Sequence, residues 1–360
     1  MSSAVATPIQ SLPCDSPRAA ASEAEAHVRS GDTAAALATL ELAVARFPAA
    51  AIPLLAMAHD IFATMEQNRY ALYVSRRFDF GLAPDARVLD VGSGHDPFPH
   101  ATHLCDVALQ DDHVGRNGAA LVTRGLPTNE CPVEDLFPYA DDSFDFVHCS
   151  HVLEHSDDPA RACRELMRVA KHGYIETPTA GKDTFLDCAR DSGHRWSVEV
   201  VGGTLRFTEY GVAQRRGSGV DVLMRMHVAP ESQREKAFSA LLLLRPELFN
   251  TMFHWRGSFR YEIHHRDGRC ERGMGPGTDA STAEAGANPN TPAFYDALYG
   301  GRYVMGDVSL PWSYDADRTD WFARVAALSF FEHAVDGLDI GSGSGGLFAA
   351  LPPGPERRLP

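Results

Sequence analysis

The chain has 360 residues, of which 44% are hydrophobic and 22% charged, a composition typical of folded globular proteins. Its formal net charge of −15 argues against nonspecific binding to nucleic acid, which needs a clustered basic surface. No stretch reaches the roughly 18 apolar residues of a membrane span, and residues 1–20 lack the pattern of a signal peptide. The seven cysteines are scattered, without a C-x-x-C pair, which argues against a disulfide framework or structural zinc and favours the cytoplasm.

The amino-terminal part predicts a tail followed by helices. Residues 1–20 are rich in serine, proline and alanine and are expected to form a loose, disordered tail. Residues 21–54 predict a helical hairpin with a break at Gly31-Asp32, and their spacing of small residues resembles one tetratricopeptide repeat. A single repeat cannot bury its own apolar face, so we expect the hairpin to cover part of the main domain rather than to bind peptides. A third helix is expected over 52–77.

Short apolar runs alternate with helical segments from about residue 87 onward. Buried strands are predicted at 87–91, 144–150 and 173–177. A helix is predicted over 159–171, with Asp158 as its N-cap and Pro159 in its first turn. This alternation predicts an α/β fold with a mostly parallel, doubly wound sheet.

The segment 88–94 reads VLDVGSG, an apolar strand that runs into glycines at its carboxyl end, where open α/β sheets bind ligands. A dinucleotide-binding turn would need a third glycine, but Gly94 is followed by His95-Asp96-Pro97. The segment resembles the first motif of class I S-adenosylmethionine (SAM)-dependent methyltransferases, where the glycines pass under the amino-acid end of SAM and the acid helps to hold its ammonium group. The cofactor-binding residues implied here are Asp90, Gly92, Ser93 and Gly94.

Asp106 ends a second apolar run, 103–105, unusually soon after Gly94, so that at most a short helix fits between them. A carboxylate can accept hydrogen bonds from two vicinal hydroxyls at once. The resemblance therefore implies that Asp106 holds the ribose of SAM, and a capping role for this residue is the alternative.

A longer pattern extends the resemblance. Residues 133–136 (VEDL) and 142–155 (DSFDFVHCSHVLEH) resemble the L-P-F…S-F-D-x-V…H-V-L-E-H core of the same superfamily, in the branch with ubiquinone-type and many small-molecule methyltransferases. Segments 164–169 and 173–178 continue it in the expected order. This ordered match identifies 55–266 as a SAM-dependent methyltransferase domain and implies a doubly wound, mostly parallel, seven-stranded Rossmann-like sheet.

One position departs from the family pattern. The acid that usually contacts the adenine amino group is replaced by Pro132, which offers neither a side-chain hydrogen bond nor an N–H. Glu130, Glu134 or the backbone at Cys131 and Val133 are the expected substitutes. Because of this departure, a non-catalytic scaffold or partner subunit is the alternative to an active enzyme.

The sequence HVLEH at 151–155 also matches the H-x-x-E-H pattern of a zinc peptidase family. Zinc would need both histidines on one helical face plus a third ligand, but the pattern directly follows a predicted strand, so no metal is expected. Ser150 and His151 are expected at the end of the fourth strand, beside the cofactor. His155 is expected either to border the substrate cavity or to hydrogen-bond within the fold.

Residues 192–199 and 205–207 are expected to be the closing strands of the sheet, with His194 where such enzymes commonly place substrate-contacting groups. Methyl transfer from SAM is an in-line displacement in which the protein mainly aligns the nucleophile with the methyl group. An oxygen or nitrogen nucleophile benefits from a base with a pKa near the working pH, which favours histidine. The candidate catalytic residues are His151, His155 and His194.

The carboxyl-terminal part predicts a linker and an incomplete domain. Residues 267–290 are rich in glycine, alanine and threonine and are expected to be a flexible linker. Within 291–360, the segment 338–346 (LDIGSGSGG) resembles a second copy of the first SAM motif, and too few residues follow it for a complete methyltransferase fold. The methyl acceptor is expected, by analogy alone, to be an O, N or C nucleophile of a small-molecule or glycan-pathway substrate.

Overall fold

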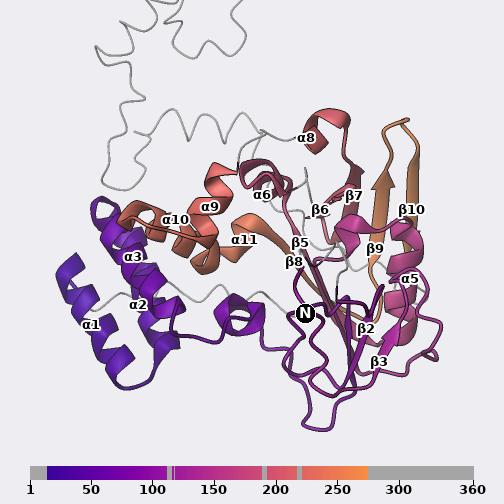
Figure 1. The fold of residues 1–360 in the computed structure, drawn as a ribbon, viewed down its shortest axis with the longest axis horizontal. Helices are drawn as coiled ribbons and strands as arrows, with labels where there is room; N and C mark the ends of the chain where they lie inside the picture. The colour runs from indigo at the N-terminus through magenta and orange to yellow at the C-terminus, as the bar shows by residue number, and fades with distance from the viewer. Residues whose placement is uncertain (1–13, 112–115, 117, 189–192, 217–220, 275–360) are drawn as a thin grey trace, which may run out of the picture. The chain divides into compact units, whose positions relative to one another are not determined.

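The computed structural model describes residues 14–111, 116, 118–188, 193–216 and 221–274 (Figure 1). All of them belong to the first of two units of the chain, Met1–Asn288. The expected linker beyond residue 274 and the expected second methyltransferase-like segment at 291–360 lie outside the described residues.

A six-stranded central sheet has the strand order β3-β2-β1-β4-β5-β8. Its strands are β1 (Val88–Val91), β2 (His103–Asp106), β3 (Thr128–Glu130), β4 (Phe146–Ser150), β5 (His172–Pro178) and β8 (Asn250–Arg256). The first five are parallel to their neighbours, and β8 runs antiparallel to β5. The expected mostly parallel α/β sheet is therefore confirmed, but the described residues give it six strands rather than seven.

A second, four-stranded sheet has the order β10-β9-β7-β6. Its strands are β6 (Trp196–Val201), β7 (Thr204–Glu209), β9 (Arg260–His264) and β10 (Cys270–Met274). The prediction that 192–199 and 205–207 close the central sheet is therefore wrong. Gly202 and Gly203 both have positive φ and join β6 to β7 as a tight antiparallel hairpin, while β8 takes the place beside β5. The strand β10 also shows that the expected linker cannot begin at residue 267.

Alternate side chains of the central strands point to opposite faces of the sheet. On one face Val147, Cys149 and Ile175 share a core with α5 (Pro159–Val169) and with the second sheet. On the other face Phe146 and Tyr174 lie in a separate core with residues between 73 and 104. As expected, the side chain of Asp158 caps α5 by accepting the N–H of Arg161.

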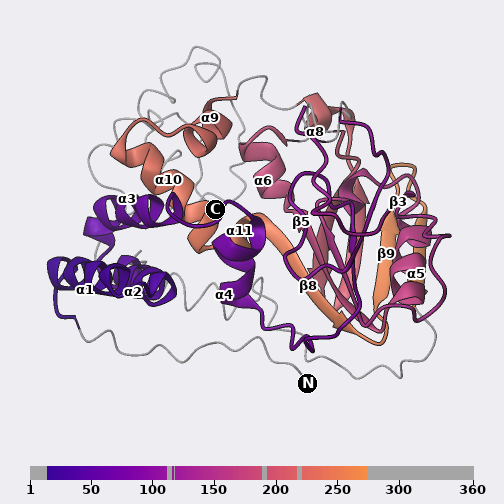
Figure 2. The same cartoon turned by 60° about the horizontal axis from the view of Figure 1, so that its bottom comes forward.

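A helical bundle is formed by α1 (Pro17–Arg29), α2 (Thr33–Arg46), α3 (Ala51–Phe62) and α10 (Gln233–Leu244), as Figure 2 shows. Its core contains fully buried alanines, among them Ala20, Ala24, Ala36 and Ala43. The expected hairpin thus packs on α3, which also packs against α10, and its likeness to a tetratricopeptide repeat stays a prediction. The expected tail 1–20 is too long, because Ser16 caps α1 and Pro17 begins it.

The third predicted helix, over 52–77, is interrupted: α3 ends at Phe62, and a π-helix, η2 (Tyr70–Val74), leads into α4 (Ser75–Arg77). The remaining short helices are η1 (Pro48–Ala50), η4 (Leu153–His155), α6 (Ala180–Phe185), α8 (Val212–Arg216), α9 (Val222–Val228) and α11 (Pro246–Phe249). Within the described ranges, no helix is both long and apolar enough to cross a membrane.

Candidate active site

The turn of residues 92–94, called here the glycine turn, follows β1 at the carboxyl edge of the sheet. Gly92 has φ +69° and Gly94 has φ +53°, a left-handed conformation that costs glycine little. A Cβ on Gly92 would lie 2.3 Å from Cγ2 of Val152, which follows β4. The backbone N–H of Gly92 donates to the carbonyl of Cys105 in β2. The glycine turn is therefore held between the carboxyl ends of β2 and β4, where such sheets bind ligands.

Three buried hydroxyls near this edge have no hydrogen-bond partner within the described part of the chain. They belong to Ser93 in the glycine turn, Ser150 at the end of β4 and Thr177 in β5. Buried polar groups are normally hydrogen-bonded, so unpartnered hydroxyls on adjoining strand ends fit a polar ligand. Ser93 and Ser150 were expected from the sequence, whereas Thr177 was not.

Asp90 is buried beneath the glycine turn. Its Oδ2 accepts the backbone N–H of Phe98 at 2.7 Å, and its Oδ1 lies 2.7 Å from Nδ1 of His148. The His148 ring in turn stacks on the Phe98 ring, with centroids 4.4 Å apart. Both carboxylate oxygens thus have protein partners that shape the loop after β1, and a direct contact with the ammonium group of SAM stays a prediction.

Asp106 lies at the end of β2, beside the glycine turn. Its Oδ2 accepts the N–H of Gly94 at 3.0 Å, and its Oδ1 accepts the N–H of Ala108 at 3.2 Å. Nη1 of Arg116 lies 3.3 Å from Oδ1 and also donates to the carbonyl of Ala108. The carboxylate expected to hold a ribose is therefore ion-paired with a buried arginine that no sequence pattern indicated.

The expected adenine-side residues have other partners. Glu134 accepts the N–H of Asp157 at 2.9 Å and the hydroxyl of Ser156, so it holds the turn after η4. Glu130 accepts the N–H of Leu109 at 3.2 Å. Val133 is buried. Both acids thus hold backbone groups of the fold through one carboxylate oxygen, and whether the other oxygen replaces the family's adenine-binding acid stays a prediction.

His151 follows β4 with a positive φ of +58°, which is uncommon for a residue with a Cβ. This conformation places its ring between two fully buried carboxylates: Nδ1 lies 3.3 Å from Oε1 of Glu154, and Nε2 lies 3.4 Å from Oε1 of Glu176. Burial by itself raises the pKa of the Glu176 carboxyl, but His151 and the hydroxyls of Tyr174 and Tyr73 lower this pKa to about 2. Glu176 is thus an ionised acid inside the protein.

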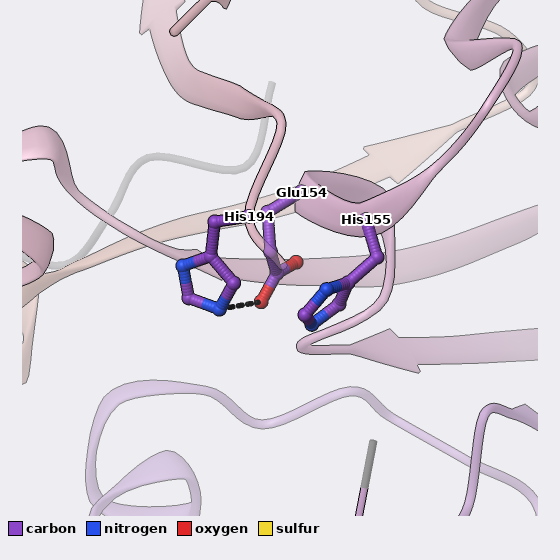
Figure 3. Close-up of side chains that lie close together, drawn as sticks. All are labelled: Glu154, His155 and His194. Carbon is purple, nitrogen blue, oxygen red and sulfur yellow. Dashed lines mark ion pairs between the residues drawn. The ribbon is translucent and has the colours of Figure 1, made fainter. Parts of the chain in front are cut away.

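His194 is oriented by a buried acid of α6. Its Nδ1 lies 2.9 Å from Oδ1 of Asp183, whose Oδ2 accepts the hydroxyl of Tyr210 at 2.8 Å. Its Nε2 lies 4.0 Å from Oε1 of Glu154, and its ring centroid lies 4.7 Å from that of His155 (Figure 3). Burial lowers the pKa of His155. All three histidines expected from the sequence therefore gather around Glu154.

The position of His194 depends on the second sheet. The N–H of Arg195 donates to the carbonyl of Glu154 at 2.7 Å, and Nε1 of Trp196 donates to the carbonyl of Ser156 at 2.8 Å. These bonds attach the start of β6 to η4, which carries Glu154 and His155. They therefore fix His194 beside those two residues.

The segment before the sheet also reaches the site. The hydroxyl of Tyr73, in the π-helix η2, donates to Oε1 of Glu176 at 2.6 Å. The backbone N–H and Nη1 of Arg69 both donate to Oδ2 of Asp96, in the loop after the glycine turn. The sequence patterns did not single out Tyr73 or Arg69, because both were polar side chains within an expected helix. The π-helix itself is a structural signal, since π-helices often occur at functional sites.

A surface cavity of about 420 Å³ lies at the opposite edge of the sheet. Its lining includes Val88 at the start of β1, Thr102 just before β2, and Phe80. Because ligands of open α/β sheets bind at the carboxyl ends of the strands, this cavity is not the expected cofactor site.

Comparison with known proteins agrees with the geometry. Residues 89–175 match a family described as "Methyltransferase domain". This segment is a class I methyltransferase domain. The demethylmenaquinone methyltransferase of Renibacterium salmoninarum is 35% identical over 97 residues, which cover 26% of this chain and 40% of that protein. The chain thus spans well under two thirds of the curated relative that it matches.

Solved methyltransferase structures are also similar in part. The YcgJ protein from Bacillus subtilis is 23% identical, and the match covers 31% of this chain and 55% of that protein, with a TM-score of 0.24. A SAM-dependent methyltransferase from Thermotoga maritima, described as a possible histamine N-methyltransferase, is 24% identical over 28% of this chain and 47% of its own, with a TM-score of 0.21. The family match ends at residue 175, so the second sheet and His194 lie beyond it.

Proposed function

We propose that this protein transfers a methyl group from SAM to an oxygen, nitrogen or carbon atom of a small-molecule or glycan-pathway substrate. The observation that carries the proposal is a pair of buried hydroxyls without partners among the described residues, that of Ser93 in the glycine turn and that of Ser150 at the end of β4. These hydroxyls fit a polar ligand at the edge where the matched family places its methyl donor.

The residues at this edge suit the parts of SAM differently. The glycine turn and the hydroxyls of Ser93 and Ser150 would hold the amino-acid end, Asp106 would hold the ribose, and the backbone near Val133 would flank the adenine. Bound SAM supplies a methyl group made electrophilic by its sulfonium. The protein aligns the acceptor with that methyl group and excludes water.

The acceptor's proton, where it has one, requires a base near the end of β4. His194 is the best-oriented candidate: a carboxylate only accepts hydrogen bonds, so Asp183 keeps the proton on Nδ1 and leaves Nε2 able to take one. His151 lies between the carboxylates of Glu154 and Glu176, so both of its ring nitrogens already face acceptors within the fold. His155 is the third candidate, and its lowered pKa keeps it neutral and able to accept a proton.

Two observations favour the alternative of a non-catalytic methyltransferase-fold scaffold or partner subunit. Arg116 is ion-paired with the carboxylate of Asp106, and Pro132 stands where the family has its adenine-binding acid, while Glu130 and Glu134 each accept a backbone N–H of the fold. A scaffold of this kind would keep the fold and lose affinity for SAM.

Thermal unfolding of the full chain with added ligands separates the two functions. A ligand that binds only the native state raises the melting temperature. We expect SAM and S-adenosylhomocysteine at millimolar concentration to raise it by several degrees, and NAD to leave it unchanged. A folded protein whose melting temperature responds to neither adenosyl ligand would overturn the proposal in favour of the scaffold.

We further propose that the protein acts in the cytoplasm on a small molecule, without a nucleic-acid or membrane partner. The net charge of −15 and the absence of a disulfide among the cysteines of the described chain support this placement. Cell fractionation that finds the protein with membranes or nucleic acid would contradict it.

A further inference from the structure

We propose that Glu154, His155 and His194 bind a divalent transition-metal ion next to the methyl-donor site. Each residue offers one ligand atom, and the three atoms lie within 4.8 Å of one another. Figure 3 shows the two rings on either side of the carboxylate. Glu154 and His194 are buried, while His155 is partly accessible, so an ion can reach the cluster.

The carboxylate of Glu154 lacks the partners that a buried charge needs. Its side chain has no exposed surface, and neither oxygen accepts a hydrogen bond from the described residues. His151 is at ion-pair distance, but the same ring also faces Glu176, so one ring is shared by two buried carboxylates. An uncompensated buried charge is costly, and a bound cation would remove that cost.

The position of His194 points to the same ion. Its Nδ1 lies 2.9 Å from Oδ1 of Asp183, and its Nε2 faces Oε1 of Glu154 from 4.0 Å away. This second separation is too long for a hydrogen bond. Two ligands of one ion, with bonds of about 2.0–2.2 Å, lie roughly 3–4 Å apart. The geometry is therefore close to that of a site before its ion binds.

The residues behind the ligands resemble the support of a built metal site. Ligand histidines usually donate their second ring N–H to a carboxylate, which fixes the ring and raises its basicity. Asp183 does this for His194, and the hydroxyl of Tyr210 fixes Asp183 in turn. Asp183 is thus a positioning residue for the metal rather than a ligand.

The ligand set defines the class of ion and differs from the peptidase pattern. Two imidazole nitrogens and one carboxylate suit Zn²⁺, Co²⁺, Ni²⁺, Fe²⁺ or Mn²⁺, whereas Mg²⁺ and Ca²⁺ prefer oxygen ligands. In the H-x-x-E-H pattern of zinc peptidases the two ligand histidines would be His151 and His155, but here His194 takes the place of His151. The sequence-based expectation of no metal rested on that pattern and did not consider His194.

Metal binding would change the roles within the site. An ion with three protein ligands keeps at least one coordination position open. The next consequence rests on the proposed methyl transfer: the open position is then available to the methyl acceptor. His155 and His194 would then act as ligands rather than as bases.

Titration of the untagged full chain with Co²⁺ tests the site without SAM. After removal of metal with a chelator, we expect one Co²⁺ per chain, a dissociation constant in the micromolar range or below, visible absorption bands, and displacement by Zn²⁺. Glu154→Gln, which keeps the shape of the side chain, should weaken binding by at least 100-fold. Asp183→Asn should weaken it by roughly 10- to 100-fold through the orientation of His194.

His264→Ala is the matched control, because this histidine lies on β9 away from the cluster and should leave Co²⁺ binding unchanged. Unchanged binding in Glu154→Gln, or no binding by a folded wild-type chain, would overturn the proposal. If Glu154→Gln does not fold, His155→Ala provides the same comparison at a partly exposed position. SAM affinity measured in parallel keeps the two proposals distinct, since a chain that binds SAM but no Co²⁺ would overturn the metal site and leave the methyl-transfer proposal standing.

Discussion

The two sides of the candidate active site are assembled in opposite ways. On the cofactor side, the glycine turn, Asp106 and Ser150 follow or end the adjacent parallel strands β1, β2 and β4, and the hydroxyls of Ser93 and Ser150 lack partners among the described residues. On the acceptor side, Glu154 receives His194 from the start of the second sheet, and Glu176 receives Tyr73 from η2. Adjacent strands of one sheet thus build the candidate donor site, whereas the acceptor side depends on contacts between elements outside that parallel sheet. Each of the following substitutions tests one side of this comparison.

The largest expected effect is at the glycine turn. Gly92→Ala combines a left-handed backbone with a Cβ that would meet Val152 at 2.3 Å, so we expect a loss of more than about 3 kcal/mol in the free energy of unfolding. Gly203→Ala is the matched control, since it has φ +76° with no atom within 4 Å of the new Cβ and should lose only about 1–2 kcal/mol. Urea denaturation measures both, and equal losses would show that the contact with Val152 is unimportant.

A smaller effect is expected at Asp106. Asp106→Asn removes the charge that would accept the ribose hydroxyls, so the dissociation constant of S-adenosylhomocysteine should rise roughly 10- to 100-fold, as for a charged hydrogen bond of about 1.5–3 kcal/mol. Asp135→Asn is a suitable control because Asp135 is partly exposed and its ion pair among the described residues is with Arg161. Unchanged affinity in Asp106→Asn would place the ribose elsewhere.

Substitution of Arg116 tests whether its ion pair with Asp106 weakens cofactor binding. Its guanidinium pairs with Asp106 in a buried contact. Arg116→Met should free the carboxylate and lower the dissociation constant of S-adenosylhomocysteine several-fold, as calorimetry would show. Weaker binding in this variant would instead make Arg116 part of the cofactor site.

The last expected effect concerns the acceptor side. Tyr73→Phe removes the hydrogen bond from the hydroxyl to Oε1 of Glu176 and should cost about 1–2 kcal/mol of stability. Tyr70→Phe, at a partly buried tyrosine one turn earlier, should cost less than about 0.5 kcal/mol. A Tyr73→Phe variant as stable as Tyr70→Phe would mean that η2 does not support the site.

The arrangement of the glycine turn, Asp106 and Ser150 could be predicted because its signals are local, while their binding of a cofactor stays a prediction. The run 88–94 combines a buried strand with glycines that the turn requires, and Asp106 and Ser150 end the two parallel strands that flank β1. The α5 helix was recognisable from its spacing and from the Asp158 cap. In each case the residues that act together are close in sequence or occupy equivalent strand ends.

The rest depended on long-range pairing that no local pattern specifies. The sequence of β6 does not show which sheet the strand joins. In the structure β8 pairs along the whole of β5, and β6 pairs with β7 in the second sheet. The same outcome brought His194 to Glu154. Likewise, nothing around Arg116 or Tyr73 in the sequence indicated that their side chains would meet Asp106 and Glu176.

Calorimetric titration of S-adenosylhomocysteine and SAM into the full chain tests the central claim most directly. The account predicts one site per chain, with a dissociation constant in the micromolar range that rises in Asp106→Asn and falls in Arg116→Met. No binding of either ligand at millimolar concentration, by a chain that unfolds cooperatively, would contradict a functional donor site at the glycine turn.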